Sequence, residues 1–437
     1  MFQTKTEIFT RLESNIRSYC NSFPTVFSKA FGSQLIDEQG HQYIDFFAGA
    51  SSLNYGHNNP KFKKHLLNYI ESGGIVQSLD MFTVAKREFI ERFEQVILKP
   101  RGLEYRFMFP GPTGTNAVEA AIKLARKVTG QQTIASFQGG FHGVTLGSLA
   151  ITTNPYYRQA AGVPLNYSIF LPFHNQVGME SLEINKVQEI IDNLKRQCEK
   201  PAACILETVQ AEGGINVASV TWLKQLSQLL QAEKILLIVD DIQVGCGRTG
   251  PFFSFERAGL KPDIICLSKS LSGYGIPLSM VLIRADLDCW APGEHNGTFR
   301  GHNLAFVTAK AALDYWQTPA LEKEIVQKAT IINDRLKKLM ANYTDFSNVL
   351  GIGLIQGIAW NPPELAKQIS QQAFERGLIL ETAGHKNEVL KLLPPLTIEP
   401  YLLHEGLNIL EASVTATLMK GDIYQAENRQ ALNKLTG

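Results

Sequence analysis

Between about residues 105 and 290, short apolar runs alternate with stretches of helical periodicity. The clearest runs cover residues 133–137, 203–207, 235–240, 264–268 and 279–283. Consecutive apolar positions indicate strands that are covered on both faces, as in a parallel sheet between layers of amphipathic helices. The pattern therefore predicts an α/β domain with a mostly parallel central sheet flanked by helices.

Different patterns lie on either side of this region. Residues 33–46 hold two short alternating runs around a Glu-Gln-Gly turn, which predicts a β-hairpin. Residues 61–98 are helical in pattern with a break at Gly73 and Gly74, and another long helical stretch covers 321–341. Short strand-like and helical segments follow, including 354–360 and 403–418.

These patterns predict two domains in one body, because no linker-like stretch or internal repeat separates them. We expect a small α+β domain built from an N-terminal segment, residues 1–60, and from the C-terminal part, residues 319–437. Residues 61–318 form the predicted large domain.

A carboxylate and a lysine end two of the apolar runs. The run 235–239 ends at Asp240, and the run 264–268 ends at Lys269, which is followed by Ser and Gly residues. A lysine at the end of a core strand is unfavourable unless its amine is neutral, paired or covalently used. Ligands of open α/β sheets bind at these carboxyl ends. A lysine and a carboxylate there suit a pyridoxal phosphate enzyme, in which the amine forms a Schiff base and the carboxylate keeps the pyridine nitrogen protonated.

A glycine-containing turn at residues 110–113 opens directly into a predicted helix. Its free N–H groups and the positive end of the helix predict a phosphate site. A capped helix without any ligand explains the same residues equally well.

Three further segments supply candidate site residues. Phe141 and His142 follow a strand and a glycine pair, and an aromatic ring there is able to stack on a flat cofactor, although a lone Phe is more often core. Glu207 and Glu212 follow another strand and suit either acid–base work or ion pairs. Thr298 lies in a polar, glycine-bearing loop, whose two histidines lack a third metal ligand. We therefore expect a binding loop and no metal.

The segment Gly245–Gly250 matches the spacing G-x-G-x-x-G, which raises the alternative of a nicotinamide oxidoreductase. A dinucleotide fingerprint opens a helix. Here a proline and three aromatic residues follow within five positions, so a glycine-rich loop beside the site is the favoured interpretation.

Composition narrows the possible partners. The 437 residues carry 42 basic and 41 acidic side chains, a net charge of +1, which offers no basic field for nucleic acid or an anionic membrane. The six cysteines have no zinc-site spacing, which favours a reducing compartment, and we expect a cytoplasmic protein. No signal peptide or apolar span of membrane length is expected.

The chain from about Phe27 to Leu418 closely resembles the class III (subgroup II) aminotransferases, which are pyridoxal phosphate enzymes of fold type I. Within that family it is most similar to the L-2,4-diaminobutyrate aminotransferases of ectoine and siderophore biosynthesis. The stretches that carry the resemblance are 54–60, 111–120, 240–250, 267–275 and 292–303.

The resemblance implies a role for each matching residue. Lys269 forms the Schiff base and later moves the proton, Asp240 pairs with the pyridine nitrogen, and Gln243 bonds the ring hydroxyl oxygen. The remaining implied cofactor contacts are those of Gly114, Thr115, Phe141, His142, Glu207 and Thr298.

The implied role of Thr298 requires a second subunit. Its hydroxyl reaches the phosphate of the neighbouring subunit's cofactor in the family. A homodimer or higher assembly with active sites at the subunit interface is therefore expected.

One position departs from the pattern of many glutamate-using relatives. Those proteins place an arginine before a Leu-Pro-Pro-Leu-like stretch to hold the α-carboxylate, and a glutamate that matches Glu212 pairs with it. Here the position holds Lys391, which offers a point charge and no bidentate fork. Glu212 and Lys391 are the predicted substrate-binding residues, with Arg248 and Arg300 as alternatives for the carboxylate.

The resemblance implies reversible ping-pong transfer of an amino group from L-glutamate to L-aspartate 4-semialdehyde, which yields 2-oxoglutarate and L-2,4-diaminobutyrate. The alternative within the family is another ω-amine: ornithine, acetylornithine, 4-aminobutyrate or taurine. A non-catalytic binding protein of the same fold is disfavoured, because Lys269, Asp240 and Gln243 are all present.

Overall fold

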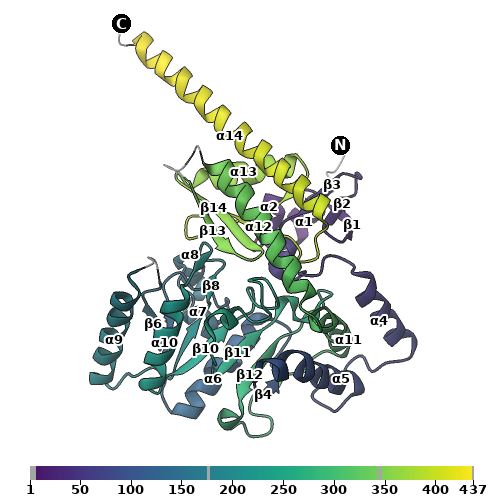
Figure 1. Cartoon of the computed structure of the whole chain (residues 1–437), viewed down its shortest axis with the longest axis vertical. Coiled ribbons are helices and arrows are strands. Elements are labelled where there is room, and N and C mark those ends of the chain that lie inside the picture. The colour runs from purple at the N-terminus through teal and green to yellow at the C-terminus, as the bar shows by residue number, and fades with distance from the viewer. Residues whose placement is uncertain (1–5, 175–177, 342, 344–346, 436–437) are drawn as a thin grey trace.

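A seven-stranded sheet forms the centre of the larger part of the molecule (Figure 1). The computed structural model describes residues 6–174, 178–341, 343 and 347–435. The strand order is β4-β12-β11-β10-β7-β5-β6. The bounds are β4 Tyr105–Met108, β5 Ile134–Phe137, β6 Ser168–Leu171, β7 Ala203–Leu206, β10 Leu236–Asp240, β11 Ile264–Leu267 and β12 Met280–Arg284.

The prediction of a mostly parallel sheet is confirmed. The strands β11, β10, β7, β5 and β6 are parallel, whereas β12 pairs antiparallel with both β11 and β4. Parallel strands need a long crossover, usually through an α-helix. Only the short 3₁₀ helix Lys269–Ser272 lies between β11 and β12, so the chain turns back beside the strand that it has just left.

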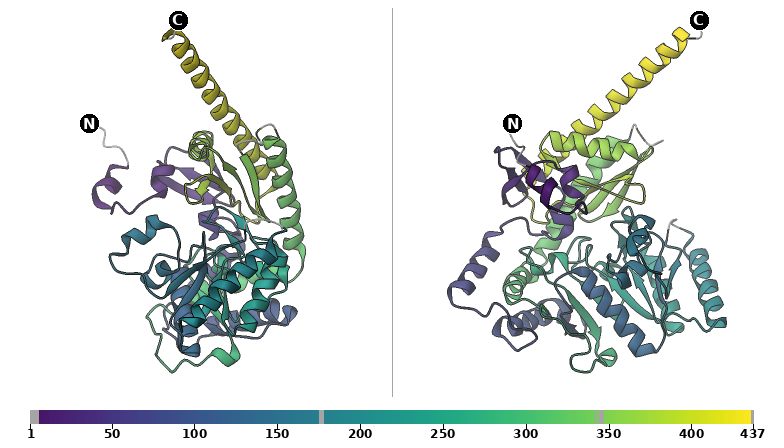
Figure 2. Two further views of the ribbon diagram at one scale, coloured as in Figure 1. Left: turned by 90° about the vertical axis from the view of Figure 1, so that its left-hand side faces the viewer. Right: turned by 180° about the vertical axis from the view of Figure 1, so that it is seen from behind.

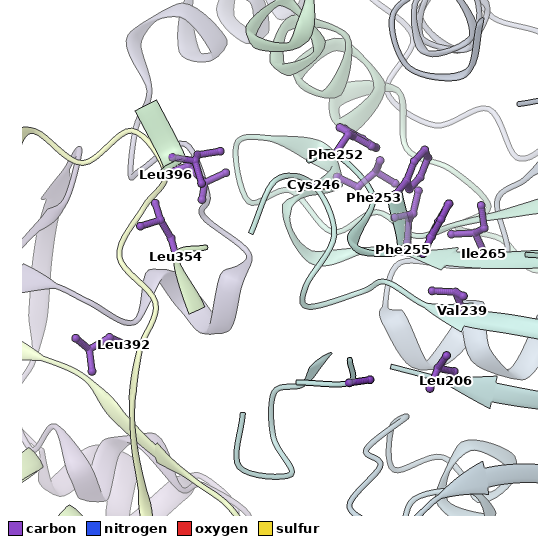
Figure 3. Packing of buried hydrophobic residues seen from close by; sticks show 14 of the residues in the cluster. Leu206, Val239, Cys246, Phe252, Phe253, Phe255, Ile265, Leu354, Leu392 and Leu396 are labelled. Carbon is purple, nitrogen blue, oxygen red and sulfur yellow. The ribbon is translucent and has the colours of Figure 1, made fainter. Parts of the chain in front are cut away.

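Successive side chains of the central strands enter different cores, which explains their unbroken apolar runs. Ile238 packs with α6 (Gly114–Thr129) on one face. Leu237 and Val239 pack on the other face with α10 (Val220–Ala232) and α9 (Glu180–Arg196). Leu206, Val239 and Ile265 come from three neighbouring strands and lie in one row across the sheet (Figure 3). The sheet is therefore buried on both sides.

A smaller part of the molecule contains two further sheets (Figure 1). One has the order β13-β14-β17-β16, with bounds β13 Ser347–Ile352, β14 Ile355–Trp360, β16 Glu381–Ala383 and β17 Val389–Leu392, and all its pairs are antiparallel. It packs with α12 (Ala320–Met340) and α13 (Glu364–Glu375). The helix α14 (Pro400–Leu435) begins against this part and extends away from it at its C-terminal end (Figure 2).

The other sheet joins the two ends of the chain. Its order is β1-β2-β3-β15, with bounds β1 Phe27–Phe31, β2 Gln34–Asp37, β3 Gln42–Asp45 and β15 Leu378–Ile379. The antiparallel pair of β2 and β3 confirms the predicted hairpin. Strand β15 pairs parallel with β3, so the N-terminal segment and the C-terminal part share one sheet. The domain boundaries at residues 60 and 318 stay predictions.

The remaining elements of the described residues are helices and one small hairpin. The predicted break at Gly73 and Gly74 lies between α4 (Pro60–Glu71) and α5 (Val84–Phe93), as expected. The other α-helices are α1 Glu7–Leu12, α2 Tyr19–Ser22, α3 Ala48–Ser51, α7 Leu146–Ala150, α8 Pro155–Arg158 and α11 Asn303–Ala312. A π-helix covers Glu94–Leu98, and a small hairpin pairs β8 (Val209–Gln210) with β9 (Asn216–Val217). Further 3₁₀ helices are Lys99–Arg101, Gln159–Ala161, Ser254–Ala258, Ala285–Leu287 and Leu313–Trp316.

None of the helices in the described ranges is long and apolar enough to cross a lipid bilayer. All six cysteines are free thiols.

The loop Gly245–Gly250 joins three distant stretches of chain through Arg248. This side chain is completely buried, and its guanidinium donates to the backbone oxygens of Leu354 (2.9 Å) and Pro394 (2.5 Å) and to Oδ1 of Asn54. Burial lowers the pKa of Arg248 to about 9. The segment after the loop contains the 3₁₀ helix Ser254–Ala258 and no dinucleotide-type helix. The interpretation as a structural glycine-rich loop is confirmed.

We expect Arg248→Lys to destabilise the fold, because one ammonium cannot reproduce a planar fork with three acceptors. The loss should correspond to about 2–3 kcal/mol, seen as a lower midpoint of thermal unfolding. Arg376→Lys is the matched control, because Arg376 is exposed and bonds only within its own turn, to Gln372. Equal midpoints for the two variants would contradict this role of Arg248.

Candidate active site

The carboxyl ends of β7, β10 and β11 lie side by side, since Val239 pairs with Leu206 and Asp240 pairs with Cys266. Glu207 and Lys269 therefore come next to Asp240 at one edge of the sheet. A cavity of about 160 Å³ opens there. It is lined by Gly114, Thr115, Phe141, His142, Gly143, Glu207, Asp240, Ile242, Gln243, Val244 and Lys269. Every predicted cofactor-binding residue except Thr298 is in this set.

Asp240 is held in place by groups on both of its carboxylate oxygens. His142 Nδ1 donates to Oδ2 at 2.8 Å, and the backbone N–H of Ile242 donates to Oδ1 at 3.2 Å. His142 is itself buried, and its backbone N–H donates to Thr152 Oγ1 at 2.9 Å. This chain of bonds aims a carboxylate at the cavity, where it can pair with a protonated ring nitrogen.

Lys269 occupies an unusual backbone position for a lysine. Its φ of +46° lies in the left-handed region, which is costly for a residue with a side chain and is concentrated at functional sites. Burial lowers the pKa of the Lys269 amine, although the nearby carboxylate of Glu212 opposes the shift. A lysine amine with a lowered pKa is present in its free, nucleophilic form in a larger fraction at neutral pH.

The N-terminus of α6 faces the same cavity. The backbone N–H of Thr113 donates to Asn116 Oδ1 at 3.1 Å, which starts the helix, and Gly114 and Thr115 are its first residues. The first N–H groups of a helix have no partner within it and carry the positive end of the helix dipole. They are suited to a phosphate group.

A cluster of hydroxyl groups supports this helix end. Thr115 Oγ1 lies 2.7 Å from both Thr145 Oγ1 and Ser148 Oγ, and the Thr145 hydroxyl donates to Glu119 Oε1 at 2.5 Å. Gly143 lies against the cluster: a Cβ on this residue would come within 2.6 Å of Thr115 Oγ1 and 2.7 Å of Ser148 Oγ. The position of Thr115 therefore requires that residue 143 has no side chain.

Phe141 is fixed to the strand ends through Glu207. Its backbone N–H donates to Glu207 Oε2 at 3.0 Å. Burial, with the neighbouring charge of Asp240, raises the pKa of Glu207 well above its usual range. Glu207 therefore anchors the Phe141 turn beside Asp240, in surroundings that disfavour its charged form.

Lys391 lies at the centre of a buried ionic cluster. Its Nζ is 2.8 Å from Glu212 Oε1 and 3.0 Å from Glu381 Oε1, and none of the Lys391 side chain is exposed. Gln243 Nε2 also donates to Glu212 Oε1, at 2.8 Å. Glu212 thus connects the predicted substrate-binding lysine with a residue of the cofactor cavity.

The two carboxyl groups of this cluster have pKa values shifted in opposite directions. Burial alone would raise the pKa of Glu212, but the ammonium of Lys391 lowers it to about 2. Burial raises the pKa of Glu381 to about 7 despite the same ammonium. The two carboxylates raise the pKa of Lys391 against the effect of its burial. Lys391 and Glu212 are therefore a charged pair, and Glu381 is the weaker partner.

Three predicted or alternative residues lie elsewhere. Thr298 is exposed, and its carbonyl accepts from Gln77 Nε2 at 2.9 Å, away from the cavity of its own chain. Arg300 lines a separate cavity of about 710 Å³ together with Phe82 and Trp290. Arg248 is committed to the three acceptors described above, so it is not available to hold a substrate carboxylate.

Glu381 was missed by the sequence analysis. It ends the apolar run 378–380 as Asp240 ends its own run, so the same signal was present. Glu381 lines a second cavity of about 520 Å³ together with Glu212, the other carboxylate of the ionic cluster. This cavity shares Phe141 with the cofactor cavity and is also bordered by Tyr19 and Tyr157. The second cavity therefore adjoins the smaller one at Phe141.

Comparison with known proteins agrees with this geometry. Residues 17–414 match the family model described as "Aminotransferase class-III". The chain belongs to this family. Similar relatives are the diaminobutyrate--2-oxoglutarate transaminases of Bordetella parapertussis (55% identical over 94% of this chain and 95% of the relative) and Halalkalibacterium halodurans (53%, 95% and 98%).

Solved structures of the same fold include an ornithine aminotransferase from Toxoplasma gondii, with a TM-score of 0.84 at 24% identity over 95% of each chain. A Bacillus anthracis aminotransferase has a TM-score of 0.84 at 23% identity over 95% of this chain and 100% of that one. The predicted fold type I architecture is confirmed.

Class III aminotransferases use pyridoxal 5'-phosphate, so the predicted cofactor is confirmed. The residues at the cavity fit this group by their chemistry. They offer a buried amine for an aldehyde, a held carboxylate for a ring nitrogen, an aromatic face and a helix N-terminus for a phosphate.

We expect Gly143→Ala to weaken the binding of pyridoxal phosphate by about tenfold or more, because the added methyl group displaces Thr115 from the helix end. Fluorescence titration of the apoenzyme with the cofactor measures the dissociation constant. Gly40→Ala is the control: Gly40 also has a positive φ, of +89°, but no atom lies within 4 Å of its added Cβ. An unchanged affinity of Gly143→Ala would contradict the role assigned to this close approach.

Proposed function

We propose that this protein is an L-2,4-diaminobutyrate:2-oxoglutarate aminotransferase. L-Glutamate donates its amino group and leaves as 2-oxoglutarate, and L-aspartate 4-semialdehyde then receives the group at C4. One observation carries the proposal. Relatives that are 48–55% identical to this chain over 94–95% of its length are named diaminobutyrate--2-oxoglutarate transaminases. The intact cavity of the cofactor residues supports catalysis over a binding role alone.

Pyridoxal phosphate, when bound, supplies an electron-withdrawing ring that stabilises negative charge at the substrate carbon. Lys269 Nζ would take the proton from the amine-bearing carbon of the donor, and in the second half-reaction it would give a proton to the carbon of the acceptor that receives the amine. Its raised acidity, which follows from burial, supports this role. Asp240 holds the proton of the pyridine nitrogen, and His142 orients Asp240 through the 2.8 Å bond.

The other cavity residues position the cofactor. Phe141 would lie against the face of the ring, and Glu207 fixes the Phe141 turn. Gln243 would bond the ring hydroxyl oxygen. The backbone N–H groups of Gly114 and Thr115 would hold the phosphate.

Glu212 and Lys391 act together at the substrate end. The ammonium of Lys391 binds the carboxylate of glutamate when the side chain of Glu212 turns away from Lys391. The 2.8 Å contact between them supports a paired role, and the bond from Gln243 to Glu212 links their state to the cofactor.

The active form is a homodimer, in which Thr298 reaches the phosphate of the partner's cofactor. Three observations support it. Phe82 is 99% exposed, and Met81 and Val84 beside it are 60% exposed each. Phe82 and Val84 border the cavity of about 710 Å³, and Gln77 bonds the carbonyl of Thr298. An apolar surface of this kind beside a binding loop fits a second copy of the chain.

The proposed location is the cytoplasm, where the product serves ectoine or siderophore biosynthesis. The six free thiols support a reducing compartment.

The first test is the visible spectrum of the purified holoenzyme, to which L-2,4-diaminobutyrate is added without an oxoacid. We expect the yellow colour to bleach, because the amine is transferred to the cofactor. Bleaching by another ω-amine alone would keep the family and refute this substrate.

Lys269→Ala should lower the rate of this half-reaction by about 10⁴-fold or more, because both the covalent attachment and the proton carrier are lost. Single-turnover absorbance measures the rate. Lys261→Ala is the control, since Lys261 is an exposed lysine ahead of the same strand. A loss below about a hundredfold would contradict the role of Lys269.

Phe82→Glu should shift the protein from dimer to monomer in analytical ultracentrifugation and lower activity in parallel, because a buried unpaired charge disrupts an apolar interface. The control is Val326→Glu, which changes a 61% exposed residue on α12. A Phe82→Glu variant that stays dimeric would refute this face as the interface.

A further inference from the structure

The register of β16 and β17 places Glu381 directly opposite Lys391. Opposed residues of an antiparallel pair project from the same face of the sheet, so their side chains are neighbours. The Nζ to Oε1 distance of 3.0 Å reflects this placement. Glu381 is thus set by backbone pairing and is not a mobile surface carboxylate.

The two carboxylates of the cluster stand between Lys391 and the substrate cavity. Glu212 and Glu381 both line the cavity of about 520 Å³, whereas Lys391 does not line it and has no exposed surface. A molecule that enters this space therefore meets negative oxygens before it meets the ammonium.

The cluster has one negative charge more than Lys391 can balance when both carboxylates are ionised. Glu212 Oε1 accepts from Lys391 and from Gln243. Glu381 is 92% buried, and its Oε1, which lies 3.0 Å from Lys391 Nζ, is a buried oxygen that accepts no well-formed hydrogen bond from the described residues. A buried carboxylate that shares its one ammonium with a second carboxylate is unfavourable until a further cation or donor reaches it.

The proposed substrates differ in whether they can supply that cation. L-2,4-Diaminobutyrate and L-aspartate 4-semialdehyde react at C4 and keep an α-ammonium group that takes no part in the transfer. L-Glutamate reacts at its single amino group, and 2-oxoglutarate has none. The unsatisfied carboxylate therefore matches one of the two substrate pairs and not the other.

We propose that Glu381 is a specificity residue, whose carboxylate binds the non-reacting α-ammonium group of the C4-reacting substrates. The proposal rests on the function proposed above. Burial raises the pKa of Glu381, which agrees with an anion that becomes fully stabilised only when the ammonium arrives. Lys391 fixes Glu381 and Glu212 at the spacing that the ligand meets.

The test compares L-2,4-diaminobutyrate with 4-aminobutyrate, which is the same molecule without the α-amino group. The wild-type holoenzyme should prefer diaminobutyrate. Glu381→Gln keeps the shape of the side chain and removes its charge, so kcat/KM for diaminobutyrate should fall by about tenfold or more. The values for 4-aminobutyrate and for glutamate should stay within about threefold of wild type.

Two companion variants separate recognition from structure. Glu388→Gln is the matched control, because Glu388 lies on the connection between β16 and β17 and its Oε2 accepts from the backbone N–H of Lys386, outside the cavity. Glu381→Asp keeps the charge and should retain more of the preference than Glu381→Gln. If Glu381→Gln does not fold, the Asp variant still allows the two amines to be compared. A shorter acid should lower kcat/KM for diaminobutyrate more than kcat/KM for 4-aminobutyrate.

Binding without turnover supplies a second readout. The pyridoxamine form of the enzyme cannot accept another amino group, so calorimetric titration of that form with each amine measures recognition alone. The affinity of Glu381→Gln should fall for diaminobutyrate and not for 4-aminobutyrate.

The outcomes are distinct. An equal loss for all three amines would give Glu381 a structural role only and overturn the proposal, as would no loss for any of them. A wild-type enzyme that ignores diaminobutyrate would refute the proposed function, and the proposal about Glu381 with it. A wild-type enzyme that uses diaminobutyrate without preference over 4-aminobutyrate would refute the role of Glu381 alone.

Discussion

The parallel alignment of β7, β10 and β11 is the constraint on which the rest of the site depends. Because the three strands point the same way in matched register, each delivers a polar residue at or just beyond its carboxyl end to the same edge. Glu207, Asp240 and Lys269 meet there without any long loop to arrange them. The sheet is buried on both faces, so this edge is rigid.

Electrostatics then shift the pKa values of neighbouring carboxyl groups in opposite directions. Burial and the charge of Asp240 raise the pKa of Glu207, whereas the ammonium of Lys391 lowers the pKa of Glu212 against the effect of its burial. Glu212 is also the shared acceptor of Gln243 and Lys391, so it links the buried lysine to a residue that lines the smaller cavity. One carboxylate thereby couples two cavities that come from different parts of the chain.

Much of this arrangement was predictable from the sequence, because local pattern carried it. Asp240 and Lys269 end apolar runs, and the turn before α6 indicates a helix N-terminus. The antiparallel direction of β12 was not predicted, since apolar runs do not reveal the direction of a strand. Nor did any local signal show that Lys391 lies between two carboxylates, because that depends on the register of β16 with β17 and on a loop far away in the sequence. The role expected of Thr298 involves a second chain, so the structure of one chain does not test it.

The parallel pairing of β3 with β15 has a consequence for how the protein is made. Ile44 finds its partner Leu378 only after about 330 further residues have left the ribosome. At about 5–20 residues per second, the wait lasts roughly 20 to 70 seconds. During that time the edge of β3 carries unpaired backbone groups, which are a template for wrong pairing with other nascent chains. Slow synthesis or a shortage of chaperones should therefore harm this protein first at its N-terminal hairpin, far from the chemistry.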